Sequence, residues 1–165
     1  MTTAIDSNVL FDVFLPDPVF EERSRKAIEE CAQHGGLVIA EPVYAELAAC
    51  FSSQAALDAM LDELEIVVEP VSRAGAFAAG RAWKKYRHAG GSRNRIMTDF
   101  LIGGHALGQG YQLLSRDRGF YQNYFRGFSS VIIRLNEGYS RIINKCFVIY
   151  DLLYSRSLKS VAFQR

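Results

Sequence analysis

The stretch TAIDSNVLFDVF, residues 3–14, changes its pattern at Asp6. The residues up to Asp6 are typical of a short strand, and from Ser7 to Phe14 the apolar residues recur at helical spacing. The chain is therefore predicted to pass from a strand into a helix at Asp6. In open α/β sheets functional groups gather at the carboxyl ends of the strands, so Asp6 is the first candidate for a functional residue.

The same alternation of strand and helix continues along the chain. Further strands are predicted at residues 37–40, 66–68, 111–115 and 131–135, the last as an edge strand. Helices are predicted at residues 17–34, 41–51, 53–64, 72–88 and 98–108, the last of them capped by Thr98. We expect one α/β domain at residues 1–135, in which three α/β/α layers surround a mostly parallel sheet of four to five strands.

Residues 136–165 differ in character from the rest of the chain. Their apolar residues recur at helical spacing, and basic residues outnumber acidic ones. We expect a helical, amphipathic C-terminal extension. Its apolar stripe needs cover from its own domain, from a second copy of the chain or from a partner protein.

Composition excludes several classes of protein. Hydrophobic residues make up 49% and charged residues 22% of the chain, close to the averages of globular proteins, which argues against disorder. No apolar run reaches the roughly 18 residues that span a bilayer, and the first residues do not resemble a signal peptide. The three cysteines form no CxxC pair, which argues against a disulfide framework or a zinc site. We therefore expect a cytoplasmic protein with no membrane partner.

Four acidic residues stand where strands end or where helices at that edge of the sheet begin: Asp6, Glu46, Asp99 and Asp117. Carboxylates that lie close together disfavour one another's ionisation, and a divalent cation relieves the repulsion. A site of carboxylates without histidine or cysteine favours Mg²⁺ or Mn²⁺. Such an ion acidifies a bound water and stabilises charge on a phosphoryl group, so the expected chemistry is hydrolysis of a phosphodiester.

Each of these acids also has a structural interpretation. Asp6 is equally explained as a helix cap, Asp99 as a complement to the helix dipole, and Asp117 as a turn residue. Glu46 is equally explained as part of a solvated helix face. The convergence of all four acids on one edge of the sheet favours the functional interpretation.

Four stretches resemble the PIN domains and, within that family, the VapC-type toxins: AIDSNVL at residues 4–10, EPVYAEL at 41–47, MTDFLIGGHAL at 97–107 and LLSRDRGFYQNYF at 113–125. The family's acids occur in the order Asp, Glu, Asp, Asp, and they carry over onto Asp6, Glu46, Asp99 and Asp117. Ser7 and Asn8 match the small polar residues that follow the first acid, and Thr98 precedes the third. Residues 136–165 match no part of the family.

The resemblance implies a PIN-like fold and a divalent-metal-dependent endoribonuclease that uses Mg²⁺ or Mn²⁺. It implies RNA as the substrate and a homodimer as the assembly. It further implies a cognate VapB-like antitoxin whose C-terminal segment covers the site.

Basic residues flank the third and fourth acids. The candidates for contacts with RNA phosphates are Lys84, Lys85, Arg87, Arg93, Arg95, Arg116 and Arg118. The net charge of the chain is only +1, so binding of nucleic acid needs a local basic patch. The alternative interpretation of these residues is a solvated helix face and loop.

Other functions fit parts of this pattern. A PIN-like nuclease that processes RNA or cuts DNA needs the same acids, because metal chemistry on a phosphodiester does not depend on the sugar. A catalytically idle PIN-like binding module does not need all of them. A dehalogenase-like enzyme needs a second aspartate two residues after Asp6, where the sequence has Asn8.

Overall fold

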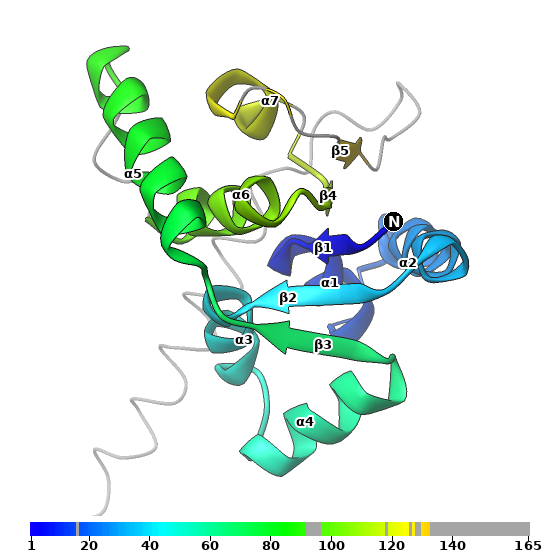
Figure 1. Cartoon of the computed structure of the whole chain (residues 1–165). Helices are drawn as coiled ribbons and strands as arrows, with labels where there is room; N and C mark the ends of the chain where they lie inside the picture. The colour runs from blue at the N-terminus through cyan, green and yellow to red at the C-terminus, as the bar shows by residue number, and fades with distance from the viewer. Residues whose placement is uncertain (16, 92–96, 118, 126, 128–129, 133–165) are drawn as a thin grey trace, which may run out of the picture. The chain divides into compact units, whose positions relative to one another are not determined.

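The computed structural model describes residues 1–15, 17–91, 97–117, 119–125, 127 and 130–132 (Figure 1). The chain divides into two units, Met1–Ile133 and Arg134–Arg165, and every described residue belongs to the first. The predicted extension at residues 136–165 lies outside the described residues, as does the end of the predicted strand at 131–135.

Strands and helices alternate along the chain. The strands are β1 Thr3–Ile5, β2 Leu37–Ala40, β3 Ile66–Glu69, β4 Gln112–Ser115 and β5 Ser130–Ile132. The helices are α1 Ser7–Phe14, α2 Glu21–His34, α3 Glu41–Ala48, α4 Gln54–Glu63, α5 Arg73–His88, α6 Met97–Gln109 and α7 Phe120–Tyr124. The five strands form one sheet in the order β3-β2-β1-β4-β5, and every neighbouring pair is parallel. The predicted α/β fold is confirmed.

The centre of the sheet is covered on both faces. Every residue of β1 and β2 is buried, as expected for parallel strands between two layers of helices. α6 packs on β1, β2 and β4, and α5 packs on α6 (Figure 1). Among the described residues, no helix is long and apolar enough to cross a membrane.

Glycines allow α5 and α6 to approach each other closely. A Cβ on Gly75 of α5 would lie 2.8 Å from the carbonyl oxygen of Gly104 in α6, and a Cβ on Gly104 would clash with the carbonyl oxygen of Gly75. Side chains at these positions would force the helices apart. The crossing therefore sets where α6 lies on the sheet.

Three local predictions differ from the structure. α2 begins at Glu21 rather than at residue 17, because the Asp17 carboxylate accepts hydrogen bonds from two backbone N–H groups and closes a turn there. Thr98 lies inside α6, which begins at Met97, so Thr98 is not the residue before the helix. The sequence pattern does not predict α7, whose five residues are too few to show a helical period.

Candidate active site

Asp6 joins the end of β1 to the start of α1. Its backbone N–H donates to the carbonyl oxygen of Leu114 in β4 at 3.0 Å, which ties Asp6 to the neighbouring strand. Its backbone is extended, with φ −77° and ψ 144°, as is usual before a helix, but its side chain makes no capping hydrogen bond. Asp6 is 3% exposed. The interpretation of Asp6 as a helix cap therefore does not explain its buried carboxylate.

Neutral side chains surround this carboxylate. Oδ2 of Asp6 accepts hydrogen bonds from Ser115 Oγ at 2.6 Å, from Asn8 Nδ2 at 2.7 Å and from the Tyr121 hydroxyl at 3.1 Å. Ser7 Oγ lies 3.4 Å from Oδ1. The hydrogen bonds from the described residues thus converge on Oδ2, and among these residues Oδ1 has only the long contact with Ser7.

Two of these donors, Ser115 and Tyr121, are not identified as site residues by sequence reasoning. Ser115 ends β4, and the register that pairs Ile5 with Leu114 places Ser115 next to Asp6. That signal exists only once β4 is known to be a neighbour of β1. Tyr121 is buried, at 3% exposure, and its hydroxyl reaches Asp6 from α7.

Other acids influence the ionisation of Asp6. Burial is the largest cause and raises the pKa of Asp6, while hydrogen bonds from Ser115 and Tyr121 lower it. The negative charges of Asp99 and Asp117 raise the pKa further. An ionised Asp6 is therefore disfavoured by its surroundings in the absence of a cation.

Glu46 lies in the same environment. Burial raises the pKa of Glu46, a hydrogen bond with Ser7 lowers it, and the charges of Asp6 and Asp99 raise it. Ser7 therefore lies between the carboxylates of Asp6 and Glu46, with a single hydroxyl proton to donate. The structure thus places all four predicted acids within one electrostatic environment.

Asp99 is held by the packing of its neighbour. It lies in the first turn of α6, next to the fully buried Phe100. The ring of Phe100 packs edge-on against Trp83 of α5, with 5.2 Å between centroids, and against Phe120 of α7, with 4.8 Å. The position of Asp99 therefore depends on the packing of α6 against α5 and α7.

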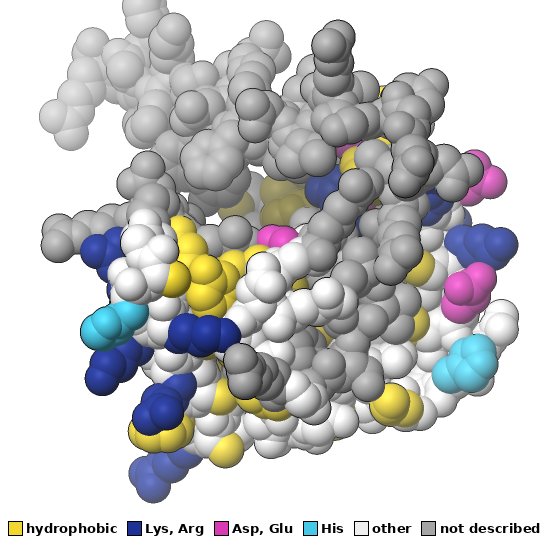
Figure 2. Space-filling view, turned by 90° about the horizontal axis from the view of Figure 1, so that it is seen from above, with side chains coloured by type: hydrophobic (Ala, Val, Ile, Leu, Met, Phe, Trp, Pro, Cys, Tyr) yellow, Lys and Arg dark blue, Asp and Glu magenta, His cyan; other side chains and the backbone are white. Residues whose placement is uncertain are grey.

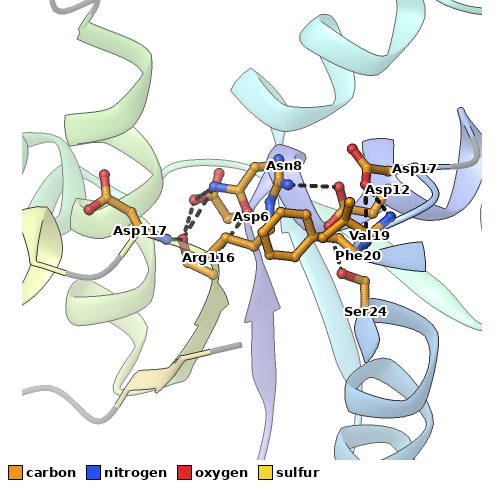
Figure 3. A network of polar contacts seen from close by, with 10 residues as sticks. Asp6, Asn8, Asp12, Asp17, Val19, Phe20, Ser24, Arg116 and Asp117 are labelled. Carbon is orange, nitrogen blue, oxygen red and sulfur yellow. Dashed lines mark hydrogen bonds and ion pairs between the residues drawn. The ribbon is translucent and has the colours of Figure 1, made fainter. Parts of the chain in front are cut away.

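Asp117 combines a structural contact with proximity to the site. Its Oδ1 accepts hydrogen bonds from the backbone N–H groups of Gly119 at 3.2 Å and Phe120 at 3.0 Å, which closes the turn before α7. In the view of Figure 3 its carboxylate is directed away from Asp6. Its charge nevertheless contributes, as the smallest of the causes, to the raised pKa of Asp6. The interpretation as a turn residue is confirmed, and it is compatible with a role in the site.

The donor set fits a hard divalent cation. The site offers carboxylate and hydroxyl oxygens, the ligands that Mg²⁺ and Mn²⁺ prefer. Among the described residues, however, no three acids, histidines or cysteines are grouped closely enough to form a ready set of ligands. The charges of the four acids thus influence one another's surroundings, but the four carboxylates are not clustered around a single position.

Arg116 is engaged inside the protein. Its guanidinium lies 3.1 Å from the Asp12 carboxylate and stacks on the ring of Phe20 at 4.3 Å, and its side chain is only 15% exposed (Figure 3). Its backbone N–H donates to Asn8 Oδ1 at 3.2 Å. This placement does not favour the predicted contact between Arg116 and RNA.

The other basic candidates separate into three groups. Lys84 is exposed on α5. Lys85 donates to the backbone oxygen of Asn123, and Arg87 donates to that of Gly91, so both are partly engaged within the protein. The remaining candidates lie outside the described residues: Arg93, Arg95 and Arg118.

Comparisons with known proteins identify a family and a shared fold. The family model described as PIN domain matches residues 3–126. VapBC-1 from nontypeable Haemophilus influenzae is similar in structure, with a TM-score of 0.62, 19% identity and coverage of 80% of this chain and 98% of that one. VapBC2 from Rickettsia felis, bound to a DNA fragment from its promoter, has a TM-score of 0.61 and 15% identity, and the match covers 81% of this chain and 100% of that one. A toxin-antitoxin complex from Klebsiella pneumoniae has a TM-score of 0.55 and 14% identity, and the match covers 81% of this chain and 99% of that one. At these identities the likeness shows the fold, and no curated protein matches the sequence.

Proposed function

Because this chain belongs to the PIN domain family, we propose that it is a divalent-metal-dependent endoribonuclease and the toxin of a VapC-type toxin–antitoxin pair. The observation that carries the proposal is the buried Asp6 carboxylate, whose surrounding donors are neutral and whose ionisation is opposed by other acids. Such an arrangement costs stability without a cation, and buried acids with a raised pKa are typical of functional sites.

Asp6, Glu46, Asp99 and Asp117 would hold the ion, Mg²⁺ or Mn²⁺. When bound, the ion supplies an acidified water and a positive charge at the scissile phosphodiester. The lack of a ready set of ligands among the described residues does not conflict with this assignment, because a cation removes the repulsion that keeps carboxylates apart.

The neutral residues of the site orient Asp6. Ser115, Asn8 and Tyr121 all donate to Oδ2, so they fix the rotation of the carboxylate. The Ser7 hydroxyl lies 3.4 Å from Oδ1 of Asp6 and also lowers the pKa of Glu46, so it interacts with both acids. Thr98 stands beside Asp99 in the first turn of α6, where we assign it a supporting role.

The partners follow from the same family assignment. Structures of similar fold carry the name VapBC, and one is described as a toxin-antitoxin complex. We propose that a VapB-like antitoxin binds this chain, that the chain forms a homodimer, and that it acts on RNA in the cytoplasm.

The test is cleavage of RNA by the purified full-length chain. We expect cleavage with Mg²⁺ or Mn²⁺ and none in excess chelator. Asp99→Asn should abolish cleavage without unfolding the protein, whereas the matched control Asp62→Asn, on an exposed position of α4, should cleave like the wild type. Cleavage in chelator, or by a folded Asp99→Asn variant, would contradict the mechanism.

The competing functions give different results in the same assay. Metal-dependent cleavage of DNA in place of RNA would support a different substrate for the same acids. A catalytically idle module would cleave neither nucleic acid and would show no binding of Mg²⁺ or Mn²⁺ by calorimetry.

A further inference from the structure

The charges on α5 are of one sign. No acidic residue occurs between Glu69 and Asp99, and α5 itself carries Arg73, Arg81, Lys84, Lys85 and Arg87. On α2, by contrast, bases and acids are paired at helical spacing, as Arg25 with Glu21 and Lys26 with Glu30. The paired charges of α2 are typical of a solvated helix face, whereas the charges of α5, all of one sign, are not.

Helical spacing places a subset of α5 residues on one outward stripe. We define the α5 stripe as Arg73, Phe77, Arg81, Lys84 and His88. These residues follow one another at intervals of three or four and are all exposed, while the opposite side of the helix buries Gly75, Ala79 and Ala82. The stripe runs the length of the helix, about 22 Å at 1.5 Å per residue.

Lys85 and Arg87 stand apart from the stripe. The Lys85 ammonium lies 5.5 Å from the centre of the Tyr124 ring, and the Arg87 guanidinium lies 5.9 Å from that of Trp83. Each also donates to a backbone oxygen. The structure therefore divides the basic residues of α5 into flanking residues that hold neighbouring segments and stripe residues that face solvent.

Phe77 is the unexpected member of the stripe. It is 72% exposed, more than any other large hydrophobic residue among those that the structure describes. Arg73 and Arg81 lie one helical turn before and after it. An exposed aromatic ring between guanidinium groups matches the combination that binds single-stranded nucleic acid, in which a base stacks on the ring and cations contact the phosphates on either side.

The C-terminal end of α5 packs against the start of α6, which carries Asp99. Trp83 and Tyr86, near the C-terminal end of α5, both pack against Phe100, the residue next to Asp99. Lys84 lies between these two aromatic residues in the sequence, at the same end of the helix. Figure 2 shows Lys and Arg side chains, with a hydrophobic side chain among them, gathered on the left, the side on which α5 lies in Figure 1.

We propose that the α5 stripe is a track for the single-stranded RNA substrate, on which Arg73, Arg81 and Lys84 contact phosphates and Phe77 stacks on a base. The proposal rests on the proposed ribonuclease function and adds the route by which the strand reaches the acids. Phosphate contacts position the strand and stacking tolerates any base, so the track binds RNA without selecting a sequence.

The test measures binding and cleavage separately. Binding of a fluorescent single-stranded oligoribonucleotide is followed by anisotropy at several salt concentrations, with full-length Asp6→Asn protein in Mg²⁺ so that the RNA stays intact. Replacing both Arg81 and Lys84 by Ala should lower the slope of log K against log salt by about 0.7 for each lost phosphate contact. Phe77→Ala should weaken binding about tenfold with little change in slope, and Phe77→Tyr should restore it.

The matched control replaces Arg25 and Lys26 of α2, two exposed basic residues, by Ala. It should change neither the affinity nor the salt slope beyond the small effect of net charge. If the α5 variants bind RNA as the α2 control does, the proposal is wrong. It is also wrong if the α5 substitutions alter the mass in solution while RNA affinity is unchanged, because the stripe is then a protein interface.

Failure of the stripe and failure of the ribonuclease assignment are distinguishable. The same stripe substitutions are made in the otherwise wild-type chain and assayed for cleavage. Metal-dependent cleavage that is unaffected by them overturns the stripe alone. Binding that depends on the stripe, in a wild-type chain that cleaves no RNA, overturns the proposed catalysis and supports the stripe.

Discussion

Asp6 and Asp12 lie at opposite ends of α1, and they are equally buried, at 3% and 2% exposure. Asp12 pairs with the Arg116 guanidinium at 3.1 Å and accepts a hydrogen bond from Ser24 at 2.6 Å. The donors to Asp6 are neutral, and the nearby charges of Asp99 and Asp117 are negative. Arg116 thus partly compensates the buried Asp12 carboxylate, whereas no cation contacts Asp6 among the residues that the structure describes. Under the proposed function, this difference separates a structural acid from a functional acid.

The two carboxylates are linked through Asn8. The Asn8 amide nitrogen donates to Asp6, and the Asn8 amide oxygen accepts the backbone N–H of Arg116 (Figure 3). The ion pair between Arg116 and Asp12 therefore anchors the segment that carries Ser115 and Asp117 into the site.

The largest expected difference between the two aspartates is in catalysis. Asp6→Asn should lower kcat/KM for RNA cleavage by about three orders of magnitude, because several kcal/mol of transition-state stabilisation accompany the metal ion. Asp12→Asn, the same chemical change at equal burial, should lower kcat/KM less than tenfold. Steady-state kinetics on both variants decide the matter, and similar losses at the two positions would remove the distinction.

For stability we expect the opposite order, in which substitution of Asp12 has the larger effect and substitution of Asp6 the smaller. Asp12→Ala removes the buried carboxylate that contacts the Arg116 guanidinium and accepts the Ser24 hydroxyl, and it should lower the free energy of unfolding by about 3 kcal/mol. Asp12→Asn keeps an acceptor oxygen and should therefore lower the free energy of unfolding by less than Asp12→Ala does. Asp6→Asn, measured without metal, should be neutral or stabilising, because it removes an acid whose ionised form is disfavoured. Urea denaturation gives all three values. A metal-free Asp6→Asn variant that is strongly destabilised would make Asp6 a structural residue.

The pH dependence of stability sharpens the description of Asp12. Burial is the largest cause that raises the pKa of Asp12 from 3.8 to about 6, and the hydrogen bond from Ser24 and the charge of Arg116 only partly oppose it. The folded state then binds this proton more tightly than the unfolded state does. The stabilisation that the bound proton of Asp12 contributes to the folded state is complete below pH 3.8, and it is lost as the pH rises through about 6.

Relative to Asp12→Asn, the wild type should therefore lose about 2 kcal/mol of unfolding free energy between pH 4 and pH 7. Denaturant titrations at several pH values check this. Parallel curves for the two proteins would show that the Arg116 charge fully offsets the burial of Asp12.

The smallest expected effect concerns the residue that orients Asp6. Tyr121→Phe removes one hydrogen bond to Oδ2 and should weaken Mg²⁺ binding about tenfold, as is usual for residues that orient a metal ligand. Tyr124→Phe, on the same helix, is the matched control and should leave the affinity unchanged. Calorimetric titration of metal-free protein measures both, and equal affinities would limit Tyr121 to packing.

Local patterns account for the part of the fold that sequence reasoning predicts correctly. The strands and most helices are recognisable because hydrophobic periodicity and stop signals act over a few residues, as in Leu37–Ala40 between two helices. The turn at Asp17 and the short helix α7 are not predicted because neither depends on periodicity. Hydrogen bonds to the Asp17 side chain form the turn, and buried aromatic packing positions α7. The order of the strands is not contained in any local pattern.

By itself, the sequence determined the alternation of strands and helices and the position of acids at the ends of strands, because both follow from neighbours in the chain. Only the tertiary structure decided which residues serve those acids. Ser115 reaches Asp6 across 109 residues because β4 pairs with β1, and Arg116 meets Asp12 at the same junction. Burial and charge compensation depend on such distant contacts, so Asp6 and Asp12 differ in their roles although both are aspartates at the ends of one helix.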